Sequence, residues 1–185
     1  CAMPQSKESF SAPITIETDR LRLRRPRPSD AVAVFDYASD VEVAHFADWP
    51  RATRVEAIAA YLKESELAWQ AGREFFWVAT PMDVDQVIGG ASLRVMGHAA
   101  DFGYVLSRKY WGKGLGTELS LAIVALALSV PGMRRVSATC DAENLASARI
   151  LEKCGLVREG VLRSLTVRPN ISREPRDAFI YSKVQ

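Results

Sequence analysis

The sequence predicts an α/β fold in which one domain is built as a mixed layer structure of strands and helices. The chain has 185 residues, which is enough to bury a substantial core and fits one domain. Apolar residues make up 48% of the chain, which argues against disorder. Strand-like and helix-like patterns follow one another in the order β-α-α-β-β-β-α-β-α-β-β, and no repeat or linker interrupts them.

The first half of the chain contains a polar beginning, a strand and two helical patterns. Residues 1–12 lack periodicity, so we expect a loose tail there and an ordered domain over residues 13–185. The elements expected next are a strand that starts at Thr15 and ends before Pro26, a helix that Ser29 or Asp30 caps and that runs through Ala38, an irregular segment 40–50, and a helix that Thr53 caps and that ends near Gly72.

The second half begins with three strand patterns joined by short turns, which predict an antiparallel meander. A glycine-rich loop and an apolar helix follow, and then a strand, a helix and two final strands. The expected bounds are 75–80, 86–95 and 101–106 for the meander, 119–130 for the apolar helix, 135–140 for the next strand, 144–154 for the last helix, and 160–167 and 177–183 for the final strands. Gly155 directly follows the last helix, at the position that favours glycine.

Charge and hydropathy argue against several classes of protein. The formal net charge is +2 with both signs well mixed, so neither a nucleic acid nor a membrane is expected as a partner. The longest apolar run, 119–130, is shorter than the roughly 20 residues that span a bilayer. Arginines alternate with leucines within residues 20–27, which is typical of the wet face of a strand, with RNA contact as the alternative. The three cysteines have neither metal-site nor disulfide spacing, which predicts a cytoplasmic protein without a metal.

The segment Tyr110–Thr117 carries the strongest chemical signal. Its sequence, YWGKGLGT, places three glycines between a strand pattern and the apolar helix. Glycine lets the main chain bend tightly, and several N–H groups at a helix N-terminus can then converge on one phosphate. Lys113 adds a positive charge at the same place. The segment therefore predicts a phosphate-bearing ligand, which we interpret as a cofactor. A nucleotide P-loop is excluded because no Gly-Lys-Ser/Thr occurs there.

Several further motifs occur in order along the chain. They are Thr18-x-Arg20-Leu-x-Leu-Arg24, Pro28-x-Asp30, Gly103-Tyr104, Trp111-Gly-Lys-Gly-Leu-Gly116, Asn144-x-x-Ser147 with Glu152-Lys153-x-Gly155, and Arg176-Asp177-x-x-x-Tyr181. In this combination the chain resembles the GCN5-related N-acetyltransferases, in particular the branch that acetylates the N-termini of ribosomal proteins. The resemblance spans residues 14–184 and implies the fold of that family, a single α/β domain with a mixed, mostly antiparallel central sheet and helices on both faces. Trp111 is a departure, because most of the superfamily has Arg or Gln there.

The resemblance implies that an amine attacks the thioester of acetyl-CoA directly. The implied cofactor contacts are in the loop and the strand before it: Tyr104, Val105, Leu106, Gly112, Lys113, Gly114, Leu115, Gly116 and Thr117. In the family this strand is bulged and diverges from the next strand. Its free backbone groups hold the pantetheine arm and polarise the thioester carbonyl, a catalytic role that falls here on the main chain that includes Leu106. Asn144 is implied to hold the cofactor arm, and an ordinary helix N-cap is the alternative.

Acetyl transfer also needs an acid for the thiolate and a base for the acceptor ammonium. Ser147 is the implied acid, because it shares a helix face with Asn144 and this helix lacks the tyrosine that many relatives use. Asp101 is the first candidate for the base, with an ordinary solvated carboxylate as the alternative, and His45 is the second candidate. Cys154 is expected to be a buried structural thiol.

Two loops, 40–54 and 167–177, are expected to select the acceptor, with Phe46 and Trp49 as candidate pocket residues. The branch resemblance favours a protein N-terminal amine. A small amine such as an antibiotic, a polyamine or an amino acid is an alternative, and so is a module that binds acyl-CoA without catalysis. The oligomeric state stays open, with a homodimer as one option.

Overall fold

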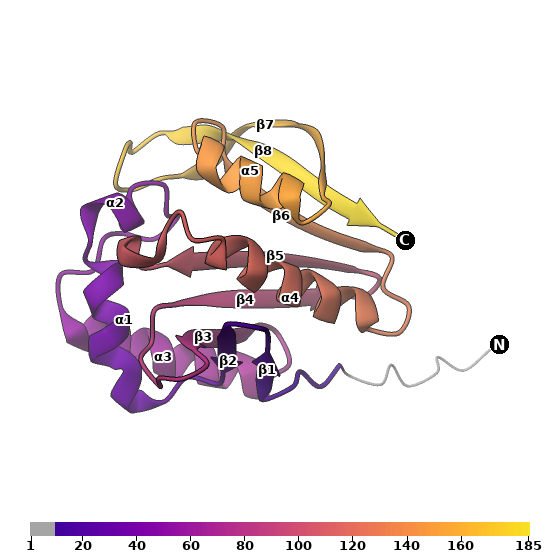
Figure 1. Ribbon diagram of the computed structural model, residues 1–185. Coiled ribbons are helices and arrows are strands. Elements are labelled where there is room, and N and C mark those ends of the chain that lie inside the picture. Colours follow the sequence, from indigo (N-terminus) through magenta and orange to yellow (C-terminus); the bar gives the residue numbers. More distant parts are fainter. Residues whose placement is uncertain (1–9) are drawn as a thin grey trace.

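The structure, a computed structural model, describes residues 10–185 and contains one open sheet of eight strands. The strand order is β1-β2-β3-β4-β5-β6-β8-β7 (Figure 1). The strands are β1 (Thr15–Glu17), β2 (Leu21–Arg24), β3 (Phe75–Pro81), β4 (Gly89–Met96), β5 (Ala99–Leu106), β6 (Arg135–Asp141), β7 (Val157–Val167) and β8 (Pro175–Val184). The helices are α1 (Ala31–Ala38), α2 (Val41–Ala44), α3 (Val55–Gln70), α4 (Leu115–Ser129) and α5 (Leu145–Lys153). Among the described strands, β5 and β6 form the parallel pair, so the expected α/β fold with a mostly antiparallel sheet is confirmed.

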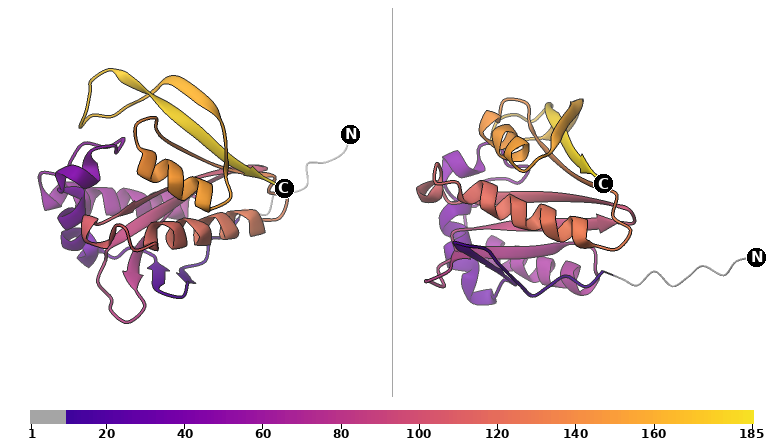
Figure 2. Two further views of the ribbon diagram at one scale, coloured as in Figure 1. Left: turned by 45° about the horizontal axis from the view of Figure 1, so that its top comes forward. Right: turned by 45° about the vertical axis from the view of Figure 1, so that its right-hand side comes forward.

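Helices cover both faces of the sheet, as expected (Figure 2). Helices α4 and α5 pack on one face, where Leu119 of α4 and Trp77 of β3 are fully buried in the larger apolar cluster. Helices α1 and α3 pack on the other face, where Ile58 of α3 and Phe76 of β3 belong to a second cluster. Neighbouring residues of β3 enter different clusters because successive side chains of a strand point to opposite faces.

A tight turn joins β4 and β5. Gly97 in this turn has a φ angle of +65°, in the left-handed region that side chains disfavour. Pairing begins at once after the turn, so β5 starts at Ala99 and not at Asp101. The register runs through eight consecutive pairs without a shift, from Met96↔Ala99 to Gly89↔Leu106. Within these described strands the bulge implied by the family resemblance is therefore absent.

Strands β5 and β6 diverge soon after they meet, as the family resemblance implies. They pair only at Ala99↔Arg135, Ala100↔Val136 and Asp101↔Ser137. Beyond this point β5 stays paired with β4, and β6 stays paired with β8. The two strands therefore separate toward the side of the molecule on which α2 lies (Figure 1).

The beginning of the packed domain differs from the sequence prediction. Residues 1–9 of the expected tail lie outside the described residues. Phe10 packs edge-to-face on Phe75 with ring centroids 5.3 Å apart, and Ala12 is 8% exposed. Phe10 and Ala12 therefore pack against the core, with the exposed Ser11 between them, and this end of the expected tail is ordered.

One additional helix and one earlier helix start also differ from the prediction. The segment expected to be irregular contains α2, which Asp40 caps by accepting hydrogen bonds from two N–H groups of the helix. Helix α4 begins directly after Gly114, so residues 115–117 form its first turn. None of the helices within residues 10–185 is long and apolar enough to cross a membrane.

Candidate active site

The glycine-rich loop leads into the N-terminus of α4. Gly112 and Gly114 have φ angles of +71° and +78°, which favour glycine at both positions. The first hydrogen bond of α4 runs from the Glu118 N–H group to the Gly114 carbonyl at 3.1 Å. The N–H groups of residues 115–117 thus have no partner within the helix. Such groups, together with the positive end of the helix dipole, can bind a phosphate.

Arg20 reaches this loop from the turn between β1 and β2, which the sequence analysis missed. Its Nη1 donates to the Lys113 carbonyl at 2.9 Å, and a Cβ at Gly114 would lie 3.4 Å from its Nη2. Glu118 holds Arg20 by accepting from its Nε at 2.6 Å and its N–H at 2.8 Å. Burial acts to raise the pKa of Glu118, but the hydrogen bonds from Thr18 and Arg20 outweigh it and lower that pKa. The Thr18-x-Arg20 motif of the family resemblance is the sequence signal here, although the alternation of Arg20 with leucines favours the wet face of a strand.

Trp111 and Lys113 flank the same loop. The Trp111 indole N–H donates to the Leu106 carbonyl at 2.8 Å, which ties the loop to the end of β5. The Nζ of Lys113 lies 5.2 Å from the centroid of the Tyr110 ring, in the range of a cation–π contact. Both Trp111 and Lys113 are exposed, so either side chain can contact a ligand at the loop.

A cleft of about 640 Å³ opens where β5 and β6 diverge. The Ser107 N–H group donates to the Ile88 carbonyl at 2.8 Å, which shows which residues of β5 direct their main-chain groups toward β4. Because these directions alternate along an antiparallel strand, the groups of Tyr104 and Leu106 face the gap and those of Val105 face β4. Of the three residues whose main chain is expected to hold the cofactor arm, Tyr104 and Leu106 thus face the cleft. The Leu106 carbonyl already accepts a hydrogen bond from Trp111, which leaves the Leu106 N–H group for a ligand.

The side chain of Tyr104 meets α5 across this cleft. Its phenol oxygen lies 3.0 Å from Oγ of Ser147, and either oxygen can be the donor. Burial raises the pKa of Tyr104 to about 12, although the hydrogen bond with Ser147 opposes this shift. The phenol therefore keeps its proton at neutral pH. A tyrosine is absent from α5, as the sequence shows, but β5 supplies the side chain of Tyr104 next to the same serine, whereas the sequence prediction concerns only the main chain of Tyr104.

Asn144 caps α5, and its side chain also lines the cleft. Its Oδ1 accepts a hydrogen bond from the Ser147 N–H group at 3.1 Å, which confirms the N-cap alternative. The cap fixes the first turn of α5 and with it the position of the Ser147 side chain. Among the described residues, the Asn144 Nδ2 donates to no protein atom, so it is available to a ligand.

The two cysteines of the ordered domain are buried and free. Burial raises the pKa of both Cys140 and Cys154 to about 11, so neither is a thiolate at neutral pH. The prediction that Cys154 is a buried thiol is confirmed, since its exposure is 1%. Cys140 lines the cleft.

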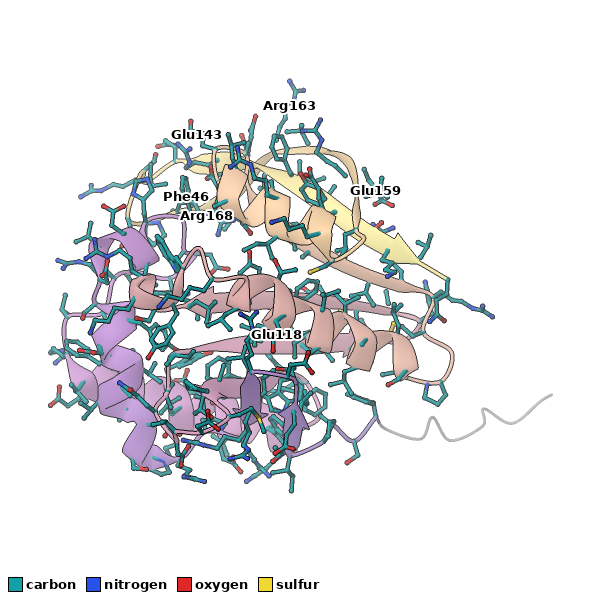
Figure 3. All side chains as sticks on the ribbon, in the orientation of Figure 1. Phe46, Glu118, Glu143, Glu159, Arg163 and Arg168 are labelled. Atoms are coloured by element: carbon teal, nitrogen blue, oxygen red, sulfur yellow. The ribbon has the colours of Figure 1, made fainter. Side chains whose placement is uncertain are left out.

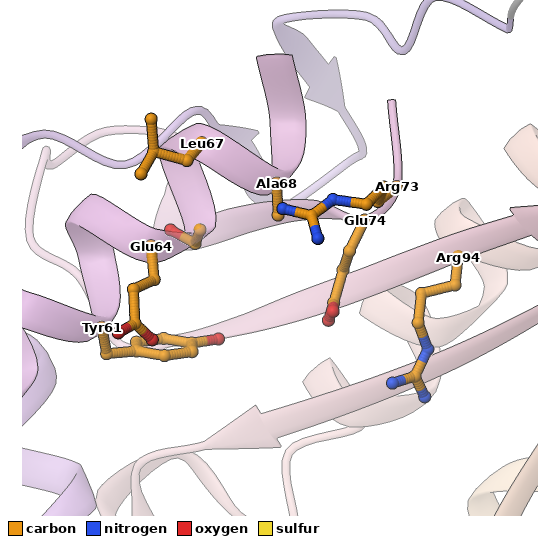
Figure 4. A pocket seen from close by; sticks show the side chains of 8 residues that line it. Tyr61, Glu64, Leu67, Ala68, Arg73, Glu74 and Arg94 are labelled. Atoms are coloured by element: carbon orange, nitrogen blue, oxygen red, sulfur yellow. The ribbon is translucent and has the colours of Figure 1, made fainter. Parts of the chain in front are cut away.

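Asp101 forms an ion pair in which both of its carboxylate oxygens are used. Arg94 donates to them from Nε at 2.9 Å and from Nη2 at 2.7 Å. Asp101, and to a lesser extent Glu74 and Asp48, raise the pKa of Arg94. Glu74 and Asp48 line the cleft without forming an ion pair to any described residue. Figure 4 shows Glu74 between Tyr61 and Arg94, at the edge of a neighbouring cavity of about 440 Å³.

His45 lies outside the walls of the cleft. Its side chain is exposed, and its ring packs edge-to-face on Phe46 with centroids 4.6 Å apart. The second candidate for the base is therefore not among the residues that surround the cleft.

The two loops expected to select the acceptor are joined by Asn170. Its Nδ2 donates to the carbonyls of Ala44 at 2.7 Å and Trp49 at 2.9 Å, and its Oδ1 accepts from the Arg51 N–H group at 2.8 Å. Phe46 and Trp49 line the cleft, as expected. The loops 40–54 and 167–177 thus form one connected wall.

Asp141, at the end of β6, is a fully buried charge beside the cleft. Its carboxylate accepts from Nε of Arg176 at 2.8 Å, from Nη2 of Arg176 at 3.1 Å and from the Glu143 N–H group at 3.0 Å. Burial acts to raise the pKa of Asp141, but these donors outweigh it and lower that pKa. Arg168 also approaches Asp141, with 3.9 Å between Nε and the nearer carboxylate oxygen.

The chain is similar to known acetyltransferases over most of its length. Residues 20–157 match the family model of the acetyltransferase (GNAT) domain. The uncharacterized N-acetyltransferase YoaA of Bacillus subtilis (strain 168) is 28% identical over 173 residues, which cover 92% of this chain and 96% of that protein.

Two solved structures show how closely the fold agrees. The microcin C7 self-immunity acetyltransferase MccE, solved with acetyl-CoA and AMP, is 21% identical, with a TM-score of 0.81 over 95% of this chain and 98% of that one. The ribosomal L7/L12 alpha-N-protein acetyltransferase RimL, solved with coenzyme A, is 19% identical, with a TM-score of 0.80 over 93% and 96% of the two chains. At such identities these likenesses concern the fold.

The match to the family model covers well over half of the chain, and its bounds include the loop, both diverging strands and α5. The chain therefore belongs to the GNAT family and is an N-acetyltransferase that takes its acetyl group from acetyl-CoA.

Proposed function

We propose that the acceptor of this N-acetyltransferase is the N-terminal amine of a protein. The observation that carries the proposal is the cleft itself, which runs from Tyr104 and Ser147 to the wall that Asn170 joins. Its volume of about 640 Å³ lies in the range of pockets that enclose a ligand and is large enough for the end of an extended peptide. The ribosomal-protein motifs of the sequence and the fold shared with RimL support a peptide acceptor.

The N–H groups of residues 115–117 and the guanidinium of Arg20 hold the pyrophosphate in this proposal. The main-chain groups of Tyr104 and the N–H of Leu106 face the gap and orient the acyl arm. Acetyl-CoA supplies the activated acetyl group. Fixed backbone donors suit the developing oxyanion because they need no reorganisation during the reaction.

Tyr104 and Ser147 together return a proton to the departing thiolate. The phenol of Tyr104 donates to Oγ of Ser147, and the serine hydroxyl donates its own proton into the cleft. The high pKa of Tyr104, about 12, keeps the phenol protonated over the whole physiological range. Ser147, the acid expected from the sequence, thus acts together with the Tyr104 hydroxyl that is hydrogen-bonded to it.

Glu74 accepts the ammonium proton through water, and Asp101 is the competing assignment. Glu74 lines the cleft without an ion pair to a described residue, whereas Arg94 holds both oxygens of Asp101. Glu74→Gln should lower kcat/KM for the acceptor about tenfold or more, as loss of a general base does. Asp101→Asn is the matched comparison, and a loss confined to that variant would assign the base to Asp101.

A small-molecule amine is the second candidate acceptor. The supporting observation is an excess of negative charge on one wall of the cleft. Three carboxylates, of Glu74, Asp48 and Asp101, surround the guanidinium of Arg94 there, and this excess attracts a cationic amine. MccE, which shares the fold, was solved with AMP in addition to acetyl-CoA. A cytoplasmic location is also part of the proposal, supported by the free Cys140 and Cys154.

The deciding experiment is acetyl-CoA-dependent release of CoA across a panel of N-terminal peptides and small amines, with a reaction lacking acceptor as the background. Turnover of peptides in preference to small amines is the expected result. Preference for small amines would replace the proposal with the second candidate. Binding of acetyl-CoA without turnover of any amine would indicate a module that binds acyl-CoA without catalysis.

A further inference from the structure

Arg168 is a buried cation in the wall of the cleft. It follows β7 directly and is 7% exposed in total. Figure 3 shows it beside Phe46, beneath the hairpin of β7 and β8, whereas Arg163 of the same hairpin points away from the molecule. Both Arg168 and Phe46 line the cleft.

The guanidinium of Arg168 makes no hydrogen bond to a protein atom in residues 10–185. Its nearest carboxylate oxygen, on Asp141, is 3.9 Å away, and Arg176 and the Glu143 N–H group already donate to that carboxylate. The buried Asp141 carboxylate thus faces two arginines, and the exposed Glu143 carboxylate also pairs with Arg176, so Arg168 is the arginine of this cluster without a closely bonded carboxylate.

The free donors of Arg168 open into the cleft. Among the described residues, the Ser120 hydroxyl is the single side-chain polar atom that is both fully enclosed and without a partner. The unpaired guanidinium nitrogens of Arg168 therefore have accessible surface, and Arg168 is among the residues that line the cleft. A guanidinium stays charged at any physiological pH, and its parallel donors fit the two oxygens of an oxyanion.

The position of Arg168 is also fixed before any ligand arrives. Its carbonyl accepts from the N–H groups of Ile171 at 2.8 Å and Ser172 at 2.9 Å, which closes a turn. Asn170, in the same turn, is bonded to the opposite loop at Ala44 and Trp49. Because its backbone is held in this way and its side chain is only 9% exposed, Arg168 loses less entropy on binding than a mobile surface arginine does.

We infer that Arg168 binds an oxyanion of the acceptor, so that the preferred acceptors are amines carrying a carboxylate or a phosphate group. This inference rests on the proposed function, because it assigns a contact within the same acceptor cleft. For a peptide acceptor, it predicts an acidic side chain close to the reacting N-terminus. The one carboxylate near Arg168 is engaged more closely by Arg176, so an acceptor oxyanion would give this buried cation a nearer counter-charge.

The test compares matched amines that differ by one charge. The peptide pair is Ser-Glu-Ala-amide and Ser-Gln-Ala-amide, the carboxylate pair is serine and serinamide, and the phosphate pair is phosphoethanolamine and ethanolamine. The wild-type enzyme should favour the anionic member of a pair by about tenfold or more in kcat/KM, as expected for a hydrogen-bonded charge. The pair with the largest ratio of kcat/KM values shows whether Arg168 prefers a carboxylate or a phosphate.

The variants are Arg168→Gln, Arg168→Lys and, as the control, the exposed Arg163→Gln. Arg168→Gln should bring the ratio within each pair close to one, and Arg168→Lys should keep part of it, because lysine retains the charge without the planar fork. Arg163→Gln should keep the whole ratio. The Kd of acetyl-CoA, measured by calorimetry, should stay within about twofold of wild type in all three variants.

The outcomes separate this inference from the proposed function. Turnover of peptides with equal rates for the Glu and Gln members, and no preference in the other pairs, overturns the inference and leaves the peptide acceptor standing. Preference for small anionic amines without peptide turnover supports the role of Arg168 and overturns the peptide acceptor. A parallel loss of acetyl-CoA affinity in Arg168→Gln overturns the inference by assigning the arginine to the cofactor. If Arg168→Gln does not fold, the wild-type ratios and Arg168→Lys decide.

Discussion

The phenol oxygen of Tyr104 and the hydroxyl oxygen of Ser147 lie 3.0 Å apart, although 43 residues separate them in the chain. If the two hydroxyls act as one proton donor, Tyr104→Phe and Ser147→Ala should each lower kcat about tenfold or more, and the double variant should lose no more than the worse single one. Single-turnover rates with saturating acetyl-CoA measure this. Tyr181→Phe, which removes a phenol bonded to Glu152, is the control. Losses that multiply in the double variant would show two independent roles.

Replacement of Gly114 tests the phosphate site. Gly114→Val should raise the Kd of acetyl-CoA at least about tenfold, because the side chain would crowd the Arg20 guanidinium at the loop and strain a φ angle of +78°. Gly132 has the same φ angle in the turn after α4 and has no atom within 4 Å of its Cβ position. Gly132→Val therefore reproduces the backbone strain away from the loop and should leave the Kd unchanged. Equal effects of the two substitutions would remove the loop from the cofactor site.

Replacement of Asn170 should weaken binding of the acceptor without weakening binding of acetyl-CoA. Asn170→Ala removes three hydrogen bonds between the acceptor loops, so the KM of the acceptor should rise several-fold and the free energy of unfolding should fall by about 1–3 kcal/mol. The exposed Arg173→Ala, in the same loop, is the control. An unchanged acceptor KM, measured at saturating acetyl-CoA, would mean that the loops keep their positions without this residue.

Asp141 makes stability depend on pH in the acid range. Its pKa in the folded protein is below the ordinary 3.8, so the stabilisation is complete above that value and is lost as the pH falls through the folded pKa. Asp141→Asn removes the buried counter-charge that Arg176 and Arg168 share and should cost about 3–5 kcal/mol at pH 7. The difference from wild type should shrink below about pH 4.

Urea unfolding at a series of pH values measures this dependence. Glu143→Gln is the matched control, since Glu143 also binds Arg176 but is 72% exposed at its side chain. That exposed pair should contribute less than about 1 kcal/mol at any pH. A difference between wild type and Asp141→Asn that stays constant down to pH 3 would contradict the assignment.

Local signals predicted the fold better than they predicted the cleft. The glycines at 97, 112, 114 and 155 all have positive φ angles, and each marked a turn or a helix end that the sequence identified. The apolar helix was predicted with a late start, because Leu115, Gly116 and Thr117 were assigned to the loop. The order of the last strands, with β8 between β6 and β7, has no local signal.

The parts of the cleft that the sequence did not reveal depend on contacts between distant segments. Tyr104 meets Ser147, and Asn170 meets Ala44, only because the sheet and the hairpin bring these residues together. Arg168 lies in a polar, proline-containing loop, where a buried arginine has the same sequence appearance as a solvated one. Burial and pairing decide its role, and both are properties of the folded chain.

The divergence of β5 and β6 gives an interior strand the exchange behaviour of an edge strand. In the free protein, the N–H groups of Tyr104 and Leu106 face the gap, so they should exchange with deuterium far faster than neighbouring N–H groups that pair with β4. An extended arm lying in the gap would slow that exchange and connect two halves of a sheet that only three residue pairs join. Occupancy of the cleft would then set how cooperatively the molecule unfolds, with a single sharp transition when the gap is filled.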